Sequence, residues 1–181
     1  MEDRFIEEDV KVRLILSGMS ELEEHGLADF SLRRAAQRAQ VSCAAPYRHF
    51  KSKEDYILEI VNYVNSKWEL LSREIERVFE GDPARLVVEL AIANLRFFAA
   101  NSNFRSVISL AHGGVLGGAL WTALSDYCDR YNLSPEEREL KEYTARIILS
   151  GTIVLLGERD AEEVLSMARR KLVQEFSPLN K

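Results

Sequence analysis

The chain has 181 residues, 46% of them hydrophobic, which is enough for one compact domain or for a small domain followed by a larger one. Acidic residues outnumber basic ones by 29 to 24, and the net charge is −5. The two cysteines, Cys43 and Cys128, lie far apart and in no metal-ligand spacing, which argues against a disulfide framework or a zinc site and favours a reducing cytoplasm.

Residues 4–25 are predicted to form one amphipathic helix. Its apolar side chains recur with a period of about 3.6 residues, at Ile6, Val10, Leu14, Met19 and Leu22. Gly26 is expected to end this helix in the left-handed conformation. We expect the helix to serve mainly as a scaffold, with Arg4, Lys11 and Arg13 in solvent; contact with a phosphate group is the alternative for these three side chains.

Residues 30–53 differ from the rest of the chain in charge. The segment contains no Asp or Glu. Its basic residues are Arg33, Arg34, Arg38, Arg48, Lys51 and Lys53. Basic charge concentrated in a short piece of an acidic protein suggests a surface that binds a polyanion. An ordinary solvated helix face is the alternative for the three arginines before residue 40.

The same segment is predicted to contain two short helices joined by a tight turn. Ser31 is a candidate N-cap for the first helix, and small apolar residues then follow at helical spacing. The turn falls at Gln40-Val41, and Ser42 can cap the second helix. Ser52, followed by Asp55 three positions later, begins a third helix. Such a helix-turn-helix can place its second helix in the major groove of DNA.

The motifs Val41-Ser42, Tyr47-x-His49-Phe50 and Lys51-Ser52-Lys53-Glu54 resemble the DNA-binding signature of TetR-family transcriptional regulators. The strict match covers about residues 26–58, and helix order and chain length extend it loosely to the rest. The sequence departs from the family at Gln40, where Gly usually precedes the Val of the turn. Gly accepts positive φ without strain, whereas Gln there costs about 1 kcal/mol, so we expect a slightly reshaped turn.

The resemblance implies a role for individual residues in DNA binding. Ser31, Tyr47, His49 and Lys53 would bind backbone phosphates, while the start of the second helix would face base edges. The alternatives are a core position for Tyr47 and a packed or capping role for His49. The predicted DNA-binding residues are Ser31, Arg33, Ser42, Cys43, Ala44, Ala45, Tyr47, Arg48, His49 and Lys53.

A long helix is predicted over residues 53–79, and its first turn closes the DNA-binding domain. We therefore expect a helix-turn-helix domain at 1–54 and a helical effector-binding and dimerisation domain at 55–181. Residues 83–100 are apolar nearly all round, which indicates a central buried helix. A short helix is expected at 104–112. The glycine-rich run at 113–118 lacks the Lys-Ser/Thr ending of a phosphate loop, so it predicts no nucleotide site.

The uncharged stretch 106–125 is long enough to raise the question of a membrane span. Its glycines, serines and histidine favour a buried, glycine-broken helical region instead.

Two C-terminal helices are predicted over 135–156, which begins with a capping box at Ser134, and over 161–176. The second half of the first is apolar on every side, which favours a four-helix homodimer interface, an arrangement that the family resemblance also implies. Burial of both helices within one subunit is the alternative. The predicted interface residues are Ile148, Gly151, Thr152, Leu155, Val164, Met167, Ala168 and Leu172.

Aromatic residues of the second domain can line an apolar pocket, although plain core packing is the alternative for each. They are Phe97, Phe98, Phe104, Trp121, Tyr127, Tyr131 and Tyr143. No catalytic motif, metal site or cofactor site is found.

The sequence therefore predicts an all-α protein that regulates transcription, most simply as a dimeric repressor released from a palindromic operator by a small apolar effector. A helical small-molecule-binding protein that has lost DNA affinity is the other hypothesis, and Gln40 is its support.

Overall fold

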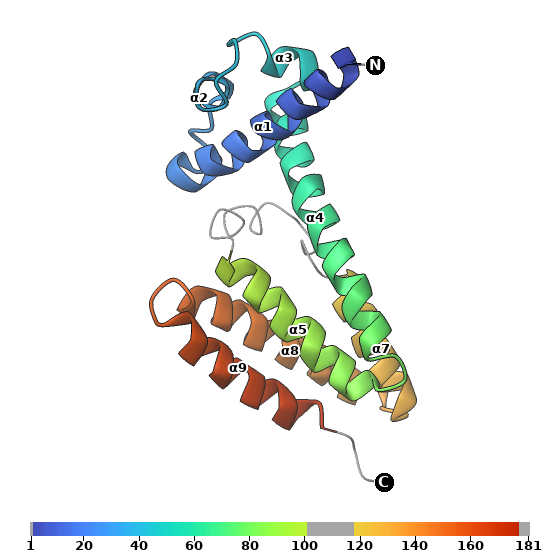
Figure 1. The fold of residues 1–181 in the computed structure, drawn as a ribbon. Coiled ribbons are helices and arrows are strands. Elements are labelled where there is room, and N and C mark those ends of the chain that lie inside the picture. Colours follow the sequence, from blue (N-terminus) through green and yellow to red (C-terminus); the bar gives the residue numbers. More distant parts are fainter. Residues whose placement is uncertain (1, 101–117, 178–181) are drawn as a thin grey trace. The chain divides into compact units, whose positions relative to one another are not determined.

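The computed structural model describes residues 2–100 and 118–177, and all regular structure in these ranges is helical (Figure 1). This confirms the predicted all-α class. The helices are α1 (Glu2–His25), α2 (Leu32–Arg38), α3 (Pro46–His49), α4 (Lys53–Val78), α5 (Pro83–Ala100), α7 (Gly118–Arg130), α8 (Pro135–Leu155) and α9 (Ala161–Glu175). The short helix expected at 104–112, Phe104 and most of the glycine run at 113–118 lie outside the described residues.

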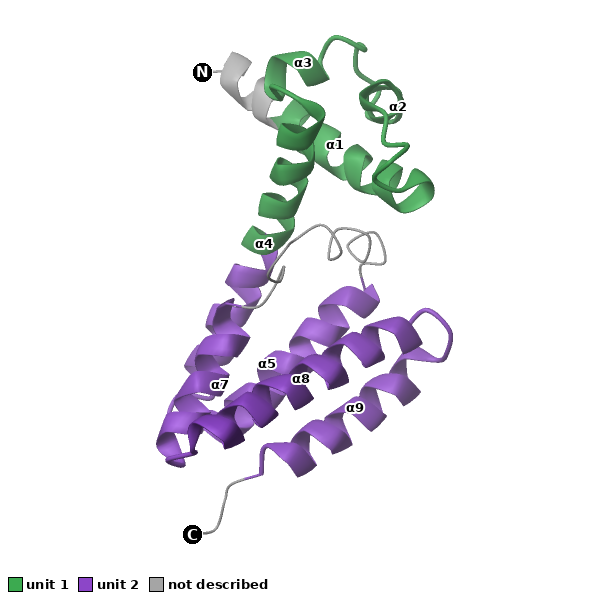
Figure 2. Ribbon diagram, turned by 180° about the vertical axis from the view of Figure 1, so that it is seen from behind, with its two compact units in different colours: residues 1–66, 103–115 green, residues 67–102, 116–181 purple. Residues whose placement is uncertain are grey.

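The chain divides into two compact units, which Figure 2 colours separately. We call them the head, whose described part runs to Ser66, and the body, whose described part comprises 67–100 and 118–177. The boundary lies inside α4, whereas the sequence placed it between residues 54 and 55. The first turns of α4 belong to the head because Tyr56 and Ile60 are fully buried there.

The core of the head forms where α1 passes close to α4. The Tyr56 hydroxyl donates a hydrogen bond to the Leu14 carbonyl oxygen, and the Tyr56 ring stacks on Phe50 with centroids 4.0 Å apart. A Cβ atom on Gly18 would lie 2.8 Å from Ile60 Cδ1 and 3.0 Å from the Tyr56 ring, so only glycine allows this approach without a shift. α1 ends, as predicted, at a left-handed Gly26 with φ of 72°.

The body is organised around α5, which contacts α7, α8 and α9. Both faces of α5 are buried, as its apolar composition predicts; its largest buried side chains are Val87, Val88, Leu90, Ile92, Leu95 and Phe98. The predicted capping box at the start of α8 is present, with the Ser134 and Glu137 side chains each accepting from the other's backbone N–H. Asp160 caps α9 through the Glu163 N–H.

None of the described helices combines the length and the apolar character that crossing a bilayer requires.

Candidate nucleic-acid interface

The turn after α2 keeps the geometry that glycine usually provides, although Gln40 occupies it. Gln40 has φ of 57°. The Val41 N–H donates to Ala36 O at 3.0 Å and the Gln40 N–H to Gln37 O at 3.0 Å, which together make a Schellman C-cap. The Arg13 guanidinium donates from α1 to the carbonyl oxygens of Ala39 and Gln40, so it caps α2 rather than extending freely into solvent.

The second helix of the motif, α3, is shorter than expected. The sequence placed its start at Ser42 to Ala45, but α3 begins at Pro46, and Cys43 and Ala44 form a turn before it. Proline sets this start because its fixed φ and missing N–H suit the first helical position. Ser42, Cys43 and Ala44 are exposed, whereas Ala45 retains only 9% exposure. Ala45 therefore packs against the head, and its contact with a base edge stays a prediction.

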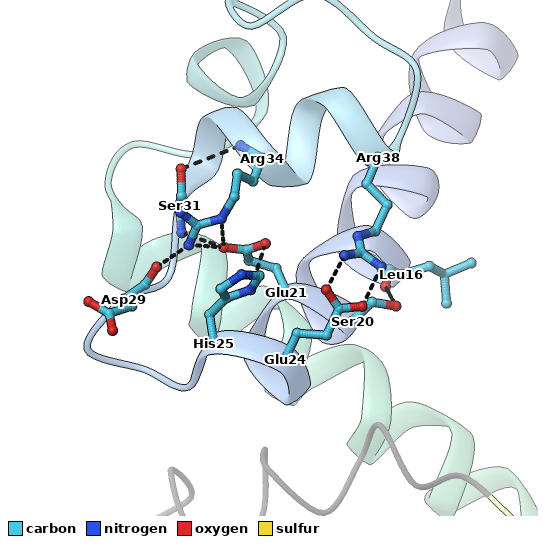
Figure 3. A network of polar contacts seen from close by, with 9 residues as sticks. All are labelled: Leu16, Ser20, Glu21, Glu24, His25, Asp29, Ser31, Arg34 and Arg38. Atoms are coloured by element: carbon cyan, nitrogen blue, oxygen red, sulfur yellow. Dashed lines mark hydrogen bonds and ion pairs between the residues drawn. The ribbon is translucent and has the colours of Figure 1, made fainter.

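Two of the basic residues are neutralised inside the head (Figure 3). The Arg34 Nε donates to Oε1 of Glu21 at 2.7 Å, and the Ser31 N–H donates to the same oxygen at 3.1 Å. The Glu21 side chain is fully buried. These contacts fix the N-terminus of α2, where Ser31 also caps the Arg34 N–H as predicted.

Arg38 forms a two-point ion pair with Glu24, whose Oε1 accepts from Nη1 at 2.8 Å. The hydrogen bond from Arg38 holds the pKa of Glu24 below its usual value. The ion pairs of Arg34 with Glu21 and of Arg38 with Glu24 were not predicted from the sequence. The sequence pattern that could have indicated them is a pair of acidic residues one turn apart on α1 and a pair of arginines one turn apart on α2.

Lys53 is partly held as well. Its Nζ donates to Ala28 O at 3.2 Å and lies 5.9 Å from the centroid of the Phe30 ring. An ammonium group has three N–H donors, so this contact leaves donors for a phosphate oxygen.

The remaining cations of the segment are available for a ligand. Arg33, Arg48 and Lys51 are exposed, and their side chains have no partner among the residues that the structure describes. Tyr47 is 71% exposed, which excludes the core position considered for it. His49 is half-buried, with its ring centroid 6.2 Å from that of Phe50. We call Arg33, Tyr47, Arg48 and Lys51 the open basic surface.

The aromatic residues predicted to line a pocket fall into separate groups within the body. Phe97 contacts Trp68 and Phe98 edge-on, while Tyr127 contacts Tyr131 and Phe176. Burial raises the pKa of Tyr127 to about 12, and its hydroxyl donates to Ser177 O.

Among the described residues, Trp121 and Tyr143 make no ring contact with either group. Trp121 lies 4.2 Å from the Arg146 guanidinium, and Tyr143 is exposed.

The predicted interface residues differ in how far they are buried within the subunit. Thr152, Val164, Ala168 and Leu172 are buried within the subunit, Ile148 and Met167 are half-buried, and Gly151 and Leu155 are exposed.

The exposed face of α8 carries an apolar stripe that was not predicted from the sequence. Its spacing of three, four and seven residues matches one face of a helix. The stripe consists of Leu140, Tyr143, Ile147 and Val154, all more than half exposed.

In the described ranges, no three His, Cys, Asp or Glu side chains gather as metal ligands would.

Comparison with known proteins gives matches in both sequence and fold. Residues 14–60 match the family model of bacterial regulatory proteins, tetR family. No curated protein sequence gives a match. The fold is similar to that of the transcriptional regulator FadR from Bacillus subtilis, solved in complex with stearoyl-CoA, with a TM-score of 0.68 and 13% identity over 93% of this chain and 99% of that one.

Two further structures have the same fold. The TetR-family transcriptional regulator PfmR from Thermus thermophilus has a TM-score of 0.66 and 20% identity, over 92% of this chain and 96% of that one. The fatty acid degradation regulator FadR from Bacillus halodurans has a TM-score of 0.63 and 15% identity, over 91% and 94%.

Proposed function

Because this chain belongs to the TetR family of bacterial regulatory proteins through the domain at residues 14–60, we propose that it is a DNA-binding transcriptional repressor that a small molecule releases from its operator. The observation that carries the proposal is the open basic surface. In a head where Arg13, Arg34 and Arg38 are paired internally, the side chains of Arg33, Arg48 and Lys51 are exposed and have no partner among the described residues, and Tyr47, next to Arg48 in the sequence, is exposed as well. Exposed cations with a neighbouring hydroxyl are what phosphate binding requires.

Base contacts would come from the turn and short helix that follow Gln40. Cys43 and Ala44 are exposed and offer small apolar contacts, for example to thymine methyl groups. Arg48, on α3, has the guanidinium geometry that binds guanine through two hydrogen bonds. Ser31, His49 and Lys53 would add contacts to the DNA backbone.

The test is fluorescence anisotropy with duplexes selected by this protein from a random pool. Arg48→Ala is expected to weaken binding by about 1–3 kcal/mol and to relax the preference at one base position. Lys51→Ala should weaken binding to all sequences alike. Arg73→Ala removes the same charge from an exposed position on the body part of α4 and serves as the control. Equal losses for all three variants would count against the open basic surface as the DNA-binding site.

We propose that the repressor is a homodimer whose subunits meet through α8 and α9. The support is the exposed stripe Leu140, Tyr143, Ile147 and Val154, with Gly151 on the same helix allowing a close approach. A monomer would leave this apolar face in water. Two-fold symmetry then predicts a roughly palindromic operator with half-sites one helical turn, about 34–36 Å, apart.

Replacing Ile147 with Glu should convert the dimer to a monomer, because it would bury two charges in an apolar contact. Sedimentation velocity gives the mass in solution. Leu70→Glu is the control, since Leu70 is an exposed apolar residue on α4, away from the stripe. A dimer that survives Ile147→Glu and Tyr143→Glu together would place the interface elsewhere.

We propose an apolar, carbonyl-bearing effector of the fatty acyl class. The fold is that of FadR from Bacillus subtilis, which was solved with stearoyl-CoA, and the body interior around α5 is rich in apolar and aromatic side chains. An effector that binds one conformation of the body more tightly shifts the population of the protein toward it. Since α4 belongs to both units, such a change can reach the head through this helix. Addition of stearoyl-CoA should release the operator in the anisotropy assay.

The alternative, a small-molecule-binding protein that has lost DNA affinity, was supported by Gln40. Gln40 adopts the left-handed conformation that the turn needs, so this support is weakened. A dimer that binds ligand but shows no salt-sensitive binding to any duplex would favour the alternative.

A further inference from the structure

One buried side-chain polar atom in the described part of the body has no hydrogen-bond partner. The indole Nε1 of Trp68 is buried and makes no hydrogen bond, and the residue as a whole is only 3% exposed. Buried polar groups in native proteins are nearly always hydrogen-bonded, and a donor left without a partner destabilises the state that contains it. The arrangement is therefore one that an added acceptor atom would stabilise.

The surroundings of Trp68 restrict the chemistry of that acceptor. The Phe97 ring packs edge-on against the indole, with centroids 6.1 Å apart, and Phe97 in turn contacts Phe98 at 6.0 Å. An indole N–H is a donor only, so its partner must be an acceptor. A carboxylate would require more than one neutral donor to offset its desolvation, whereas a carbonyl oxygen requires one. The aromatic neighbours suit an apolar chain attached to that carbonyl.

We propose that the Trp68 indole N–H donates a hydrogen bond to the carbonyl oxygen of a fatty acyl effector, with the acyl chain against Phe97 and Phe98. The proposal deepens the proposed function and rests on it, because it assumes that the effector binds in the body. It assigns to Trp68 the selection of a carbonyl over a methylene group at one point of the ligand.

The test compares two probes that differ only at the proposed acceptor. Stearoyl-CoA carries a thioester carbonyl, and S-octadecyl-CoA has a methylene group in its place. The wild-type protein is expected to bind stearoyl-CoA about five to ten times more tightly, which is the usual effect of one neutral hydrogen bond. Trp68→Phe should bind the two probes equally, and its affinity for S-octadecyl-CoA should stay within about twofold of wild type. Binding is measured by calorimetry below the micelle concentration of each probe.

A second variant separates the loss of the donor from the loss of ring area. Benzothienylalanine incorporated at position 68 keeps the bicyclic shape but replaces N–H with sulfur. It too should lose the preference for the carbonyl probe. A preference that persists in either variant overturns the proposal, as does a wild-type protein that binds neither probe or does not discriminate between them.

An internal partner for the indole would produce a different result. Both variants would then lower the melting temperature of the ligand-free protein and change the affinities for the two probes by the same factor, which would also overturn the proposal. Operator binding by the ligand-free protein is measured in parallel. Its absence in the wild type would refute the repressor function, while the comparison of the two probes would still decide the role of Trp68.

Discussion

Gln40 holds a backbone conformation that L-residues other than Asn and Asp rarely adopt. Its φ of 57° closes the Schellman cap of α2, where most helices use glycine. We predict that Gln40→Gly raises the free energy of unfolding of the head by about 0.5–1 kcal/mol, because relief of left-handed strain exceeds the added entropy of the unfolded chain. Urea denaturation followed by circular dichroism measures the change. Gln40→Ala keeps the strain and should be neutral; equal stabilisation by both variants would contradict the argument.

Gly18 lies at a close approach of α1 to α4. An alanine Cβ would press on Ile60 Cδ1 and on the Tyr56 ring, which is itself fixed by its stacking on Phe50 and its hydrogen bond to Leu14. We predict that Gly18→Ala destabilises the head by about 1–3 kcal/mol through overpacking, despite the higher helix propensity of alanine.

Ser20→Ala, two residues further along α1 at a partly exposed position, is the control and should change stability by less than about 0.5 kcal/mol. An unchanged or raised melting temperature in Gly18→Ala would show that α4 moves away at little cost.

At the scale of the elements, Glu89 and Arg169 join the central helix of the body to the last one. The Arg169 guanidinium donates two hydrogen bonds to the Glu89 carboxylate, at 2.8 and 2.7 Å. This contact holds the pKa of Glu89 below its usual value of 4.5. A carboxyl whose pKa is lowered by folding stabilises the folded state above its unfolded pKa, and this contribution is lost as the pH falls through the lowered value.

We predict that Glu89→Gln costs about 0.5–1 kcal/mol at pH 7, a modest value because the pair is partly exposed. The difference from wild type should shrink between pH 5 and pH 3. Thermal unfolding across this pH range gives the measurement, and Glu162→Gln on the exposed face of α9 controls for the lost charge. A difference that is constant from pH 7 to pH 3 would contradict the assignment.

The elements that the sequence predicted well are those defined by local signals. The left-handed Gly26, the Ser31 cap and the capping box at Ser134 each involve residues within one turn of a helix, so their outcome depends little on the rest of the chain. The start of α3 was misplaced because Ser42 and Pro46 both signal a helix start, and the proline prevailed.

Tertiary partners were beyond sequence reasoning. Arg34 and Arg38 read as open basic charge because the acids that neutralise them lie on another helix. Val164 and Leu172 were predicted to lie in the dimer interface, but both are buried within the subunit. The sequence of a helix that is apolar on both faces does not indicate whether its own subunit or a second one covers a given residue. The open stripe on α8 is visible only once the buried face is known.

At the scale of the whole molecule, the number of Lys and Arg side chains that bind phosphates determines how steeply the affinity for DNA falls with salt concentration. Arg33, Lys51 and Lys53, the cations proposed to bind phosphates, would neutralise about six phosphates in the two heads of a dimer, which predicts a slope of about −5 in a plot of log K against log salt concentration. Titrations between 50 and 300 mM KCl give the slope. A slope near −10 would mean that the internally paired arginines also reach the DNA.

Glu24→Gln tests the same relation by adding one cation to each head that can bind a phosphate. The substitution frees Arg38 from its ion pair, so the slope for the dimer should become steeper by about two and binding to nonspecific duplex should strengthen. Glu23→Gln, an equal change of charge at the neighbouring exposed residue, should leave the slope unchanged. Identical slopes for the two variants would refute the idea that Glu24 withholds Arg38 from DNA.

In the proposed function, the carboxylates of α1 would thus limit how strongly the protein holds DNA of arbitrary sequence. Every chromosome offers a vast excess of unrelated sites, and weak attraction to them shortens each unproductive encounter. For the repressor proposed above, with less of its population spread along the chromosome, a small number of copies per cell would be enough to keep one promoter occupied, and a modest amount of inducer would be enough to empty it.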